Sequence, residues 1–192
     1  MKSLPRIIML LAIAGLLTLF LFPMWKIILY APQYPDGVKM LIWINKVGGE
    51  TASTIQTINI LNHYVGMKFI EPDSIPELKY FPTIVWIMIG LGLVTVLLNK
   101  SWGYAIWGMM MIILAALAVY DFYLWEYEYG HSLSDTAPIK IPGASFQPPL
   151  IGTKRILNFI AYSFPDTAGY LGGLSIPLSF VAFWFCRKIK RG

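Results

Sequence analysis

The chain has 192 residues, of which 57% are hydrophobic and 13% are charged, and its formal net charge is +5. A soluble domain usually carries about 25% charged residues, so the composition excludes an ordinary soluble protein and indicates membrane insertion. The bases flank apolar segments instead of forming a patch, which argues against nucleic-acid binding, and the single cysteine, Cys186, excludes an intramolecular disulfide.

The first apolar segment covers about residues 7–25. This is close to the roughly 20 residues that a helix needs to cross the hydrocarbon core. Lys2 and Arg6 precede the segment as in a signal peptide, but no small-x-small cleavage site follows it. We therefore expect a retained membrane anchor.

The interval 26–80 is long for a connector and has an internal pattern. Residues 38–47 form an apolar stretch that suits either a strand or an interfacial segment. Ser53 then opens a capping-box spacing, and apolar residues recur at helical intervals as far as Val65. Because Gly66 is a natural helix end, we predict a helix over 53–65.

A histidine and a methionine stand four residues apart at the end of this predicted helix. Imidazole and thioether ligands together suit cuprous copper. His63, Met67 and His131 are therefore the candidate metal ligands, and copper is the candidate cofactor. The alternative is structural, because a histidine beside Asn59 more often makes a hydrogen bond and a methionine more often packs.

Two further apolar segments lie at about 81–98 and 102–120, with a tight turn at 99–101. Pro82 suits the first turn of the earlier helix. None of the apolar segments has an ionisable residue in its middle, which argues against transport by this chain alone.

The third apolar segment continues into a stretch, Asp121 to His131, in which acids lie among five aromatic residues. Burial among aromatic rings raises the pKa of carboxyl groups, and carboxylates also bind metals or the basic patch of a partner. Trp125, Glu126 and Glu128 are the candidate partner-docking residues. The alternative is an interfacial helix end whose aromatic residues lie at the headgroups and whose acids face water.

The rest of the second long interval has two predicted features. Residues 139–150 are extended and stiffened by Pro148 and Pro149, which indicates a strap over other structure or a docking strand. Lys154 to Tyr162 predicts a short amphipathic helix parallel to the membrane.

The last apolar segment covers about residues 170–186. All ten acidic residues lie in the intervals 26–80 and 121–169. The ends on the opposite side carry bases and no acid: Lys2, Arg6, Lys100, Arg187, Lys188, Lys190 and Arg191. The positive-inside rule then places both termini in the cytoplasm and both long intervals outside.

The predicted fold is an all-α membrane protein: a bundle of four transmembrane helices with two ordered extracytoplasmic loops, in one integral membrane domain over residues 1–192. We expect it in the bacterial cytoplasmic (inner) membrane, in contact with the lipid bilayer and with both large loops in the periplasm. We also expect His63 and His131 to come near each other across an outer cap.

Recognised catalytic motifs are absent from the sequence, including the Walker, dinucleotide, HExxH, CxxC and GxSxG patterns. A membrane enzyme that uses Asp121, Glu126, Glu128 and His131 would lack any known reaction signature. We therefore predict that the protein is not an enzyme and assign no catalytic residues.

Four distinctive strings lie in the two long intervals: APQYP at 31–35, NxxNHYxGM at 59–67, DFYxWEYxYGH at 121–131 and QPPLIG at 147–152. These strings resemble those of a family of small four-span membrane proteins. That family is associated with nitrous-oxide reductase gene clusters in Bacteroidetes and related bacteria. The resemblance implies a context of nitrous oxide reduction and denitrification, and it places His63, Met67 and His131 in shared motifs.

Two functions follow as hypotheses. The first is an accessory membrane protein that assists the maturation, copper supply or electron supply of a periplasmic copper enzyme, as in a nitrous-oxide reductase system. The second is a structural or electron-transfer docking subunit without a metal, whose partner would be a cytochrome or another membrane respiratory subunit. Neither hypothesis involves nucleic acid.

Overall fold

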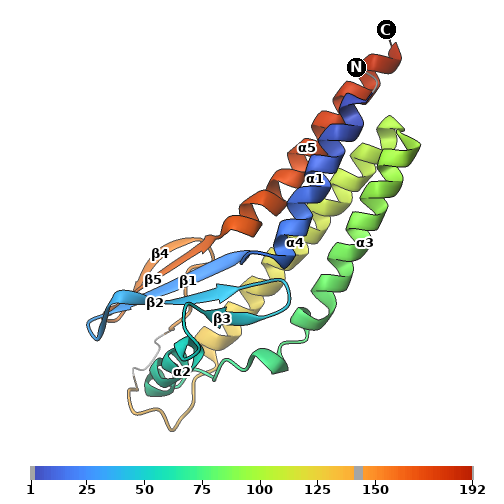
Figure 1. The fold of residues 1–192 in the computed structure, drawn as a ribbon. Coiled ribbons are helices and arrows are strands. Elements are labelled where there is room, and N and C mark those ends of the chain that lie inside the picture. The colour runs from blue at the N-terminus through green and yellow to red at the C-terminus, as the bar shows by residue number, and fades with distance from the viewer. Residues whose placement is uncertain (1–2, 141–144, 192) are drawn as a thin grey trace.

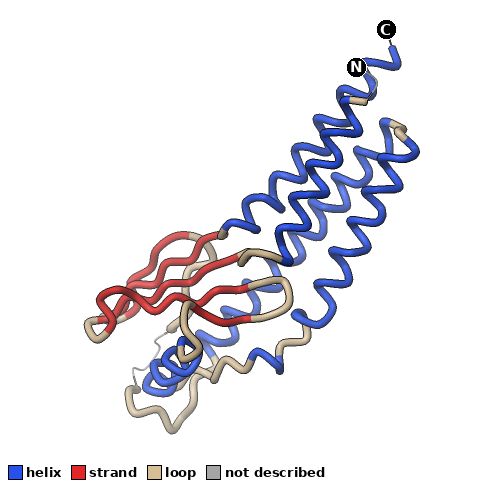
Figure 2. The backbone as a smooth tube through the Cα atoms, in the orientation of Figure 1, coloured by secondary structure: helices blue, strands red, loops and turns tan. Residues whose placement is uncertain are grey.

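The computed structural model describes residues 3–140 and 145–191, and Figures 1 and 2 show it as two regions. Long helices run side by side in one region, and a sheet with a short helix forms a cap at the other end. The two chain ends and the turn between α3 (Glu77–Leu98) and α4 (Ser101–His131) lie at the end opposite the cap (Figure 1).

Four helices form the bundle. They are α1 (Leu4–Leu17, continued by the 3-10 turn Thr18–Phe20), α3 (Glu77–Leu98), α4 (Ser101–His131) and α5 (Thr167–Arg191). Three of these, α3, α4 and α5, are long and apolar enough to cross a membrane, whereas Leu4–Phe20 is a shorter apolar helix. The first predicted span thus ends earlier than residue 25, where a strand begins.

Small residues bring α1 and α5 into close contact. A Cβ atom at Gly15 would lie 2.6 Å from the carbonyl oxygen of Leu171. Ser175 donates a hydrogen bond from Oγ to the carbonyl oxygen of Ala12 at 2.7 Å. Such contacts allow helices to pack without the hydrophobic driving force that water provides. Buried Met9, Leu16 and Trp107 belong to the core of this bundle.

The cap overturns the predicted all-α fold. It contains a five-stranded antiparallel sheet of order β3-β2-β1-β5-β4. The chain is therefore a mixed α/β protein. The strands are β1 (Trp25–Ala31), β2 (Tyr34–Ile42), β3 (Val47–Gly49), β4 (Gly152–Ile156) and β5 (Phe159–Pro165).

The predicted amphipathic helix over 154–162 is wrong, because this segment forms the β4–β5 hairpin. Ile156 pairs with Phe159 across a two-residue turn, in which Leu157 has a φ of 56°. Short apolar runs fit a strand as well as a helix, so neighbours decide between them. Here β5 pairs with β1 in a register that places Trp25 opposite Pro165.

Two other predictions for the cap are confirmed. The strand alternative holds for Val38 to Ile42, which belong to β2. The helix predicted to end at Gly66 is α2 (Thr54–Val65), and Gly66 has the left-handed φ of 80° that favours glycine at a helix end. Ser53 is the N-cap residue, but it lacks the side-chain hydrogen bond that the capping box predicted.

Helix α4 is longer than a membrane requires. Its 31 residues extend about 45 Å at 1.5 Å per residue, whereas the hydrocarbon core is about 30 Å thick. The last part, Asp121–His131, is named the α4 extension here. Phe122 in the extension packs against Trp25 of β1 with ring centroids 5.3 Å apart. The extension therefore belongs to the cap, where it shares a hydrophobic core with the sheet and α2.

An extended segment lies on the α4 extension. Of the predicted strap 139–150, residues 141–144 lie outside the described residues. Residues Ser145–Leu150 are named the strap here, and the Phe146 amide of the strap donates to the carbonyl oxygen of Gly130 at 3.0 Å. This agrees with the prediction of a strap over other structure.

Candidate functional site

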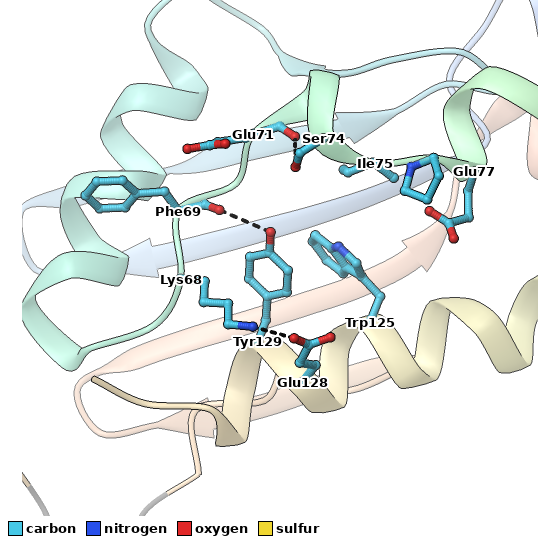
Figure 3. Close-up of a pocket in the computed structure, with 10 residues that line it drawn as sticks. Lys68, Phe69, Glu71, Ser74, Ile75, Glu77, Trp125, Glu128 and Tyr129 are labelled. Atoms are coloured by element: carbon cyan, nitrogen blue, oxygen red, sulfur yellow. Dashed lines mark hydrogen bonds and ion pairs between the residues drawn. The ribbon is translucent and has the colours of Figure 1, made fainter. Parts of the chain in front are cut away.

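A cavity of about 500 Å³ lies between the α4 extension and the segment that joins α2 to α3 (Figure 3). It is named the acidic pocket here. Side chains of the α4 extension point toward the joining segment across it. Its charged and aromatic lining residues are Lys68, Phe69, Glu71, Glu77, Trp125, Glu128 and Tyr129.

Two asparagines of α2 shape one wall of the acidic pocket. Asn59 forms two hydrogen bonds with the backbone of Ile70. Its Nδ2 donates to the Ile70 carbonyl oxygen at 3.0 Å, and its Oδ1 accepts from the Ile70 amide at 2.7 Å. Asn62 Nδ2 donates to the carbonyl oxygen of Lys68 at 3.1 Å. These bonds clamp the backbone at the start of the joining segment.

Two contacts then fasten this segment to the α4 extension. The Tyr129 hydroxyl donates to the carbonyl oxygen of Phe69 at 3.1 Å, and Lys68 forms an ion pair with Glu128 (Figure 3). Both side chains of the ion pair are exposed, so the pair itself contributes little to stability. Lys68 and Glu128 both line the acidic pocket, so the pair places one positive and one negative group there.

The lining carries more negative than positive charge. Three carboxylates, Glu71, Glu77 and Glu128, stand against one ammonium group, that of Lys68. The pKa of the Tyr129 hydroxyl is raised by its burial, and then by the negative charges of Glu128 and Glu71. The same field favours a cation. Trp125 and Tyr129 add aromatic faces, on which a cation also binds favourably.

The three predicted docking residues occupy different places. Trp125 and Glu128 line the acidic pocket, whereas Glu126 is 0% exposed. Neither carboxyl oxygen of Glu126 has a hydrogen-bond partner among the described residues. Burial raises the pKa of Glu126 to about 8, although the positive charge of Lys154 opposes this shift. Glu126 is therefore part of the interior in this conformation.

Two of the three candidate metal ligands share a cavity. His63 and Met67 line a second cavity, of about 210 Å³, that is named the His63 cavity here. His131 instead stacks on Tyr127 with ring centroids 4.0 Å apart, and its Nδ1 lies 2.9 Å from the carbonyl oxygen of Tyr127. Imidazole and thioether groups in one cavity fit the ligand preference of cuprous copper.

The backbone segments that follow the two histidines are hydrogen-bonded to each other, whereas the expected approach of His63 to His131 stays a prediction. The Ser134 amide donates to the carbonyl oxygen of Gly66 at 2.8 Å, and the Ile139 amide donates to that of Tyr64 at 2.9 Å. The His63 ring itself contacts Tyr64 and Phe69, at centroid distances of 6.2 and 6.3 Å. Among the described residues, no group of three or more His, Cys, Asp or Glu side chains is placed to hold a metal.

Sequence reasoning missed the acids that complete the acidic pocket. Glu71 and Glu77 precede the second apolar span and read there as ordinary acids outside the membrane. Their approach to Trp125 and Glu128 depends on how the joining segment folds back, and no local pattern encodes that path. The available signal was the local cluster of three acids, Glu71, Asp73 and Glu77, just before this span.

Comparison of the chain with protein-family models, with curated proteins and with solved structures finds no match.

Proposed function

We propose that this protein is an accessory protein of the bacterial cytoplasmic membrane whose periplasmic cap docks a basic segment of a partner protein in the acidic pocket. The partner would be a periplasmic copper enzyme of the nitrous-oxide reductase type, which the protein helps to mature or to supply. The termini of the chain would lie in the cytoplasm. The resemblance of the four sequence strings supports the context, and the acidic pocket supports the docking.

One observation supports the proposed docking site. Two of the residues proposed for docking from sequence, Trp125 and Glu128, line one cavity together with Glu71 and Glu77. Aromatic residues are frequent anchors at interfaces, and a complementary charge raises the rate of association. A lysine or arginine on a partner would find both features in this cavity.

The cap is well placed for such a role because it is continuous with the bundle. Helix α4 passes without interruption from Ser101 to His131 and carries the docking residues on its last turns. A partner bound in the acidic pocket would therefore be held at a fixed distance from the bundle. This would suit delivery from a membrane component to a periplasmic enzyme.

The test combines genetics with crosslinking in the native bacterium. We expect deletion of the gene to lower nitrous-oxide reduction and the copper content of the reductase. Complementation by wild type should restore both, whereas Trp125→Ala/Glu128→Lys should not. A photocrosslinking residue at Ile75, which lines the pocket, should label the partner, whereas one at Asp36, on the exposed β1–β2 hairpin, should not.

Two results would reject the proposal. One is an unchanged reductase after deletion of the gene. The other is full complementation by the double variant, provided that the variant accumulates in the membrane at the wild-type level.

A second candidate function, direct copper handling, rests on a different observation. His63 and Met67 face the same small cavity, so an imidazole and a thioether are available together. These ligands would hold cuprous copper until transfer to the enzyme. A copper titration, described in the Discussion, separates this function from docking alone.

A further inference from the structure

The helical face next to the acidic pocket contains a carboxyl group that the proposed docking does not use. Phe122, Glu126 and Gly130 follow one another at four-residue intervals, so they share one face of the α4 extension. Phe122 packs on Trp25 of β1, and Gly130 packs on the strap. Glu126 lies between them and is fully buried.

Three hydrogen bonds hold the strap over this face. The Phe146 amide donates to the Gly130 carbonyl oxygen, Lys154 Nζ donates to that of Gln147 at 3.0 Å, and Ser163 Oγ donates to that of Leu150 at 3.0 Å. Helix α4 and strands β4 and β5 thus each contribute one bond. The strap therefore lies against the α4 extension one helical turn after Glu126, and Lys154, which donates to the strap, is also the charge that acts on Glu126.

The Glu126 carboxyl lacks the partners that a buried charge requires. Its two oxygens are buried, and neither accepts nor donates a hydrogen bond among the described residues. An ionised carboxylate in that condition is far more costly than a neutral carboxylic acid, so the group binds a proton instead. The raised pKa of Glu126 agrees with this conclusion from geometry.

The charged groups on the surrounding elements each interact with another partner, so Glu126 is still expected to bind a proton. Lys154 on β4 favours the ionised form, but it is exposed and donates to the strap. Arg155 on the same strand donates to the carbonyl oxygen of Leu157. Lys26 on β1 lies 3.8 Å from Asp166, which follows β5. Glu128, the neighbouring acid on the helix, pairs with Lys68.

We infer that Glu126 is a buried proton-binding site, and that loss of its proton releases the strap Ser145–Leu150 from the α4 extension. An ionised Glu126 needs water, and water reaches the carboxylate when the strap leaves. The attached strap therefore favours the protonated acid, and the detached strap favours the carboxylate. By linkage, the attachment of the strap weakens as the pH rises from the ordinary pKa of a carboxyl group to the raised pKa of buried Glu126. This inference is independent of the proposed function.

The test measures hydrogen–deuterium exchange at the Phe146 amide in the full-length protein in lipid nanodiscs. Wild type is compared with Glu126→Gln, which stays neutral, and with Glu128→Gln as the exposed control on the same helix. Between about pH 6 and about pH 9, we expect the protection factor in wild type and in the control to fall by roughly tenfold or more. In Glu126→Gln it should stay constant.

Infrared spectroscopy provides a second measurement that needs no movement of the strap. Wild type at neutral pH should show the carbonyl stretch of a protonated carboxylic acid, absent from Glu126→Gln. Lys154→Met removes the opposing charge together with one bond to the strap, so only the infrared band is followed in this variant, and its pH midpoint should move upward. The inference fails if that band is absent, or if wild type and Glu126→Gln keep equal protection at about pH 9.

Discussion

Gln147 lies so close to Gly130 that a Cβ atom at position 130 would come within 2.4 Å of the Gln147 backbone. The strap and the α4 extension are therefore in direct backbone contact, and the side chain of any other residue would separate them. Because Gly130 follows Glu126 by four residues, the contact lies one helical turn from the Glu126 carboxyl group.

Gly130→Ala should destabilise the cap. Insertion of a methyl group into a filled space forces backbone shifts that cost about 1–3 kcal/mol. We expect a lower thermal midpoint in detergent and faster exchange of the Phe146 amide. Gly90→Ala is the matched control, because this helical glycine has nothing within 4 Å of its Cβ position. An unchanged midpoint for Gly130→Ala would mean that the strap does not rest on the helix.

Asn59→Ala should loosen the wall of the acidic pocket. The substitution removes both hydrogen bonds to Ile70 and leaves its backbone groups unpaired, at a cost of roughly 1–3 kcal/mol. Exchange at the Ile70 amide should accelerate, and the thermal midpoint should fall. Gln56→Ala, on the exposed face of the same helix, should leave both quantities unchanged. Equal behaviour of the two variants would contradict the clamp.

The stability of the protein should fall as the pH rises through the range set by Glu126. The folded pKa is about 8, above the ordinary value of 4.5, so the folded state retains a proton that the unfolded state releases. The contribution of Glu126 to stability is therefore highest below about pH 4.5 and declines until about pH 8. At pH 7 the loss is roughly 3 kcal/mol.

Glu126→Gln checks this dependence by removing the titrating group. The thermal midpoint of the variant, relative to wild type, should rise between about pH 5 and about pH 8 and then level off. Glu128→Gln should show no such trend, since Glu128 is exposed. A constant difference between wild type and Glu126→Gln over this range would contradict the raised pKa.

Copper binding should depend on His63 more than on His131. His63 shares a cavity with Met67, whereas His131 is held on Tyr127. We expect titration with cuprous copper to show about one equivalent in wild type. His63→Ala and Met67→Leu should each weaken binding, and His131→Ala should have a smaller effect. Equal binding by wild type and the His63→Ala/His131→Ala variant would remove copper handling and leave docking as the function.

Features that depend on local composition could be predicted from the sequence. The apolar segments at 81–98, 102–120 and 170–186 became helices long enough to cross a membrane, because their length and hydropathy are local properties. Helix α2 and its end at Gly66 also followed from local spacing and from the freedom of glycine at positive φ.

The sheet and the burial of the individual acids depend on contacts between distant parts of the chain. Strand β1 pairs with β5 although Trp25 and Pro165 are far apart in the chain, and such pairing leaves no local pattern. Glu126 and Glu128 looked equivalent in sequence. The first is fully buried and the second lines the acidic pocket, because helical geometry turns them to different neighbours.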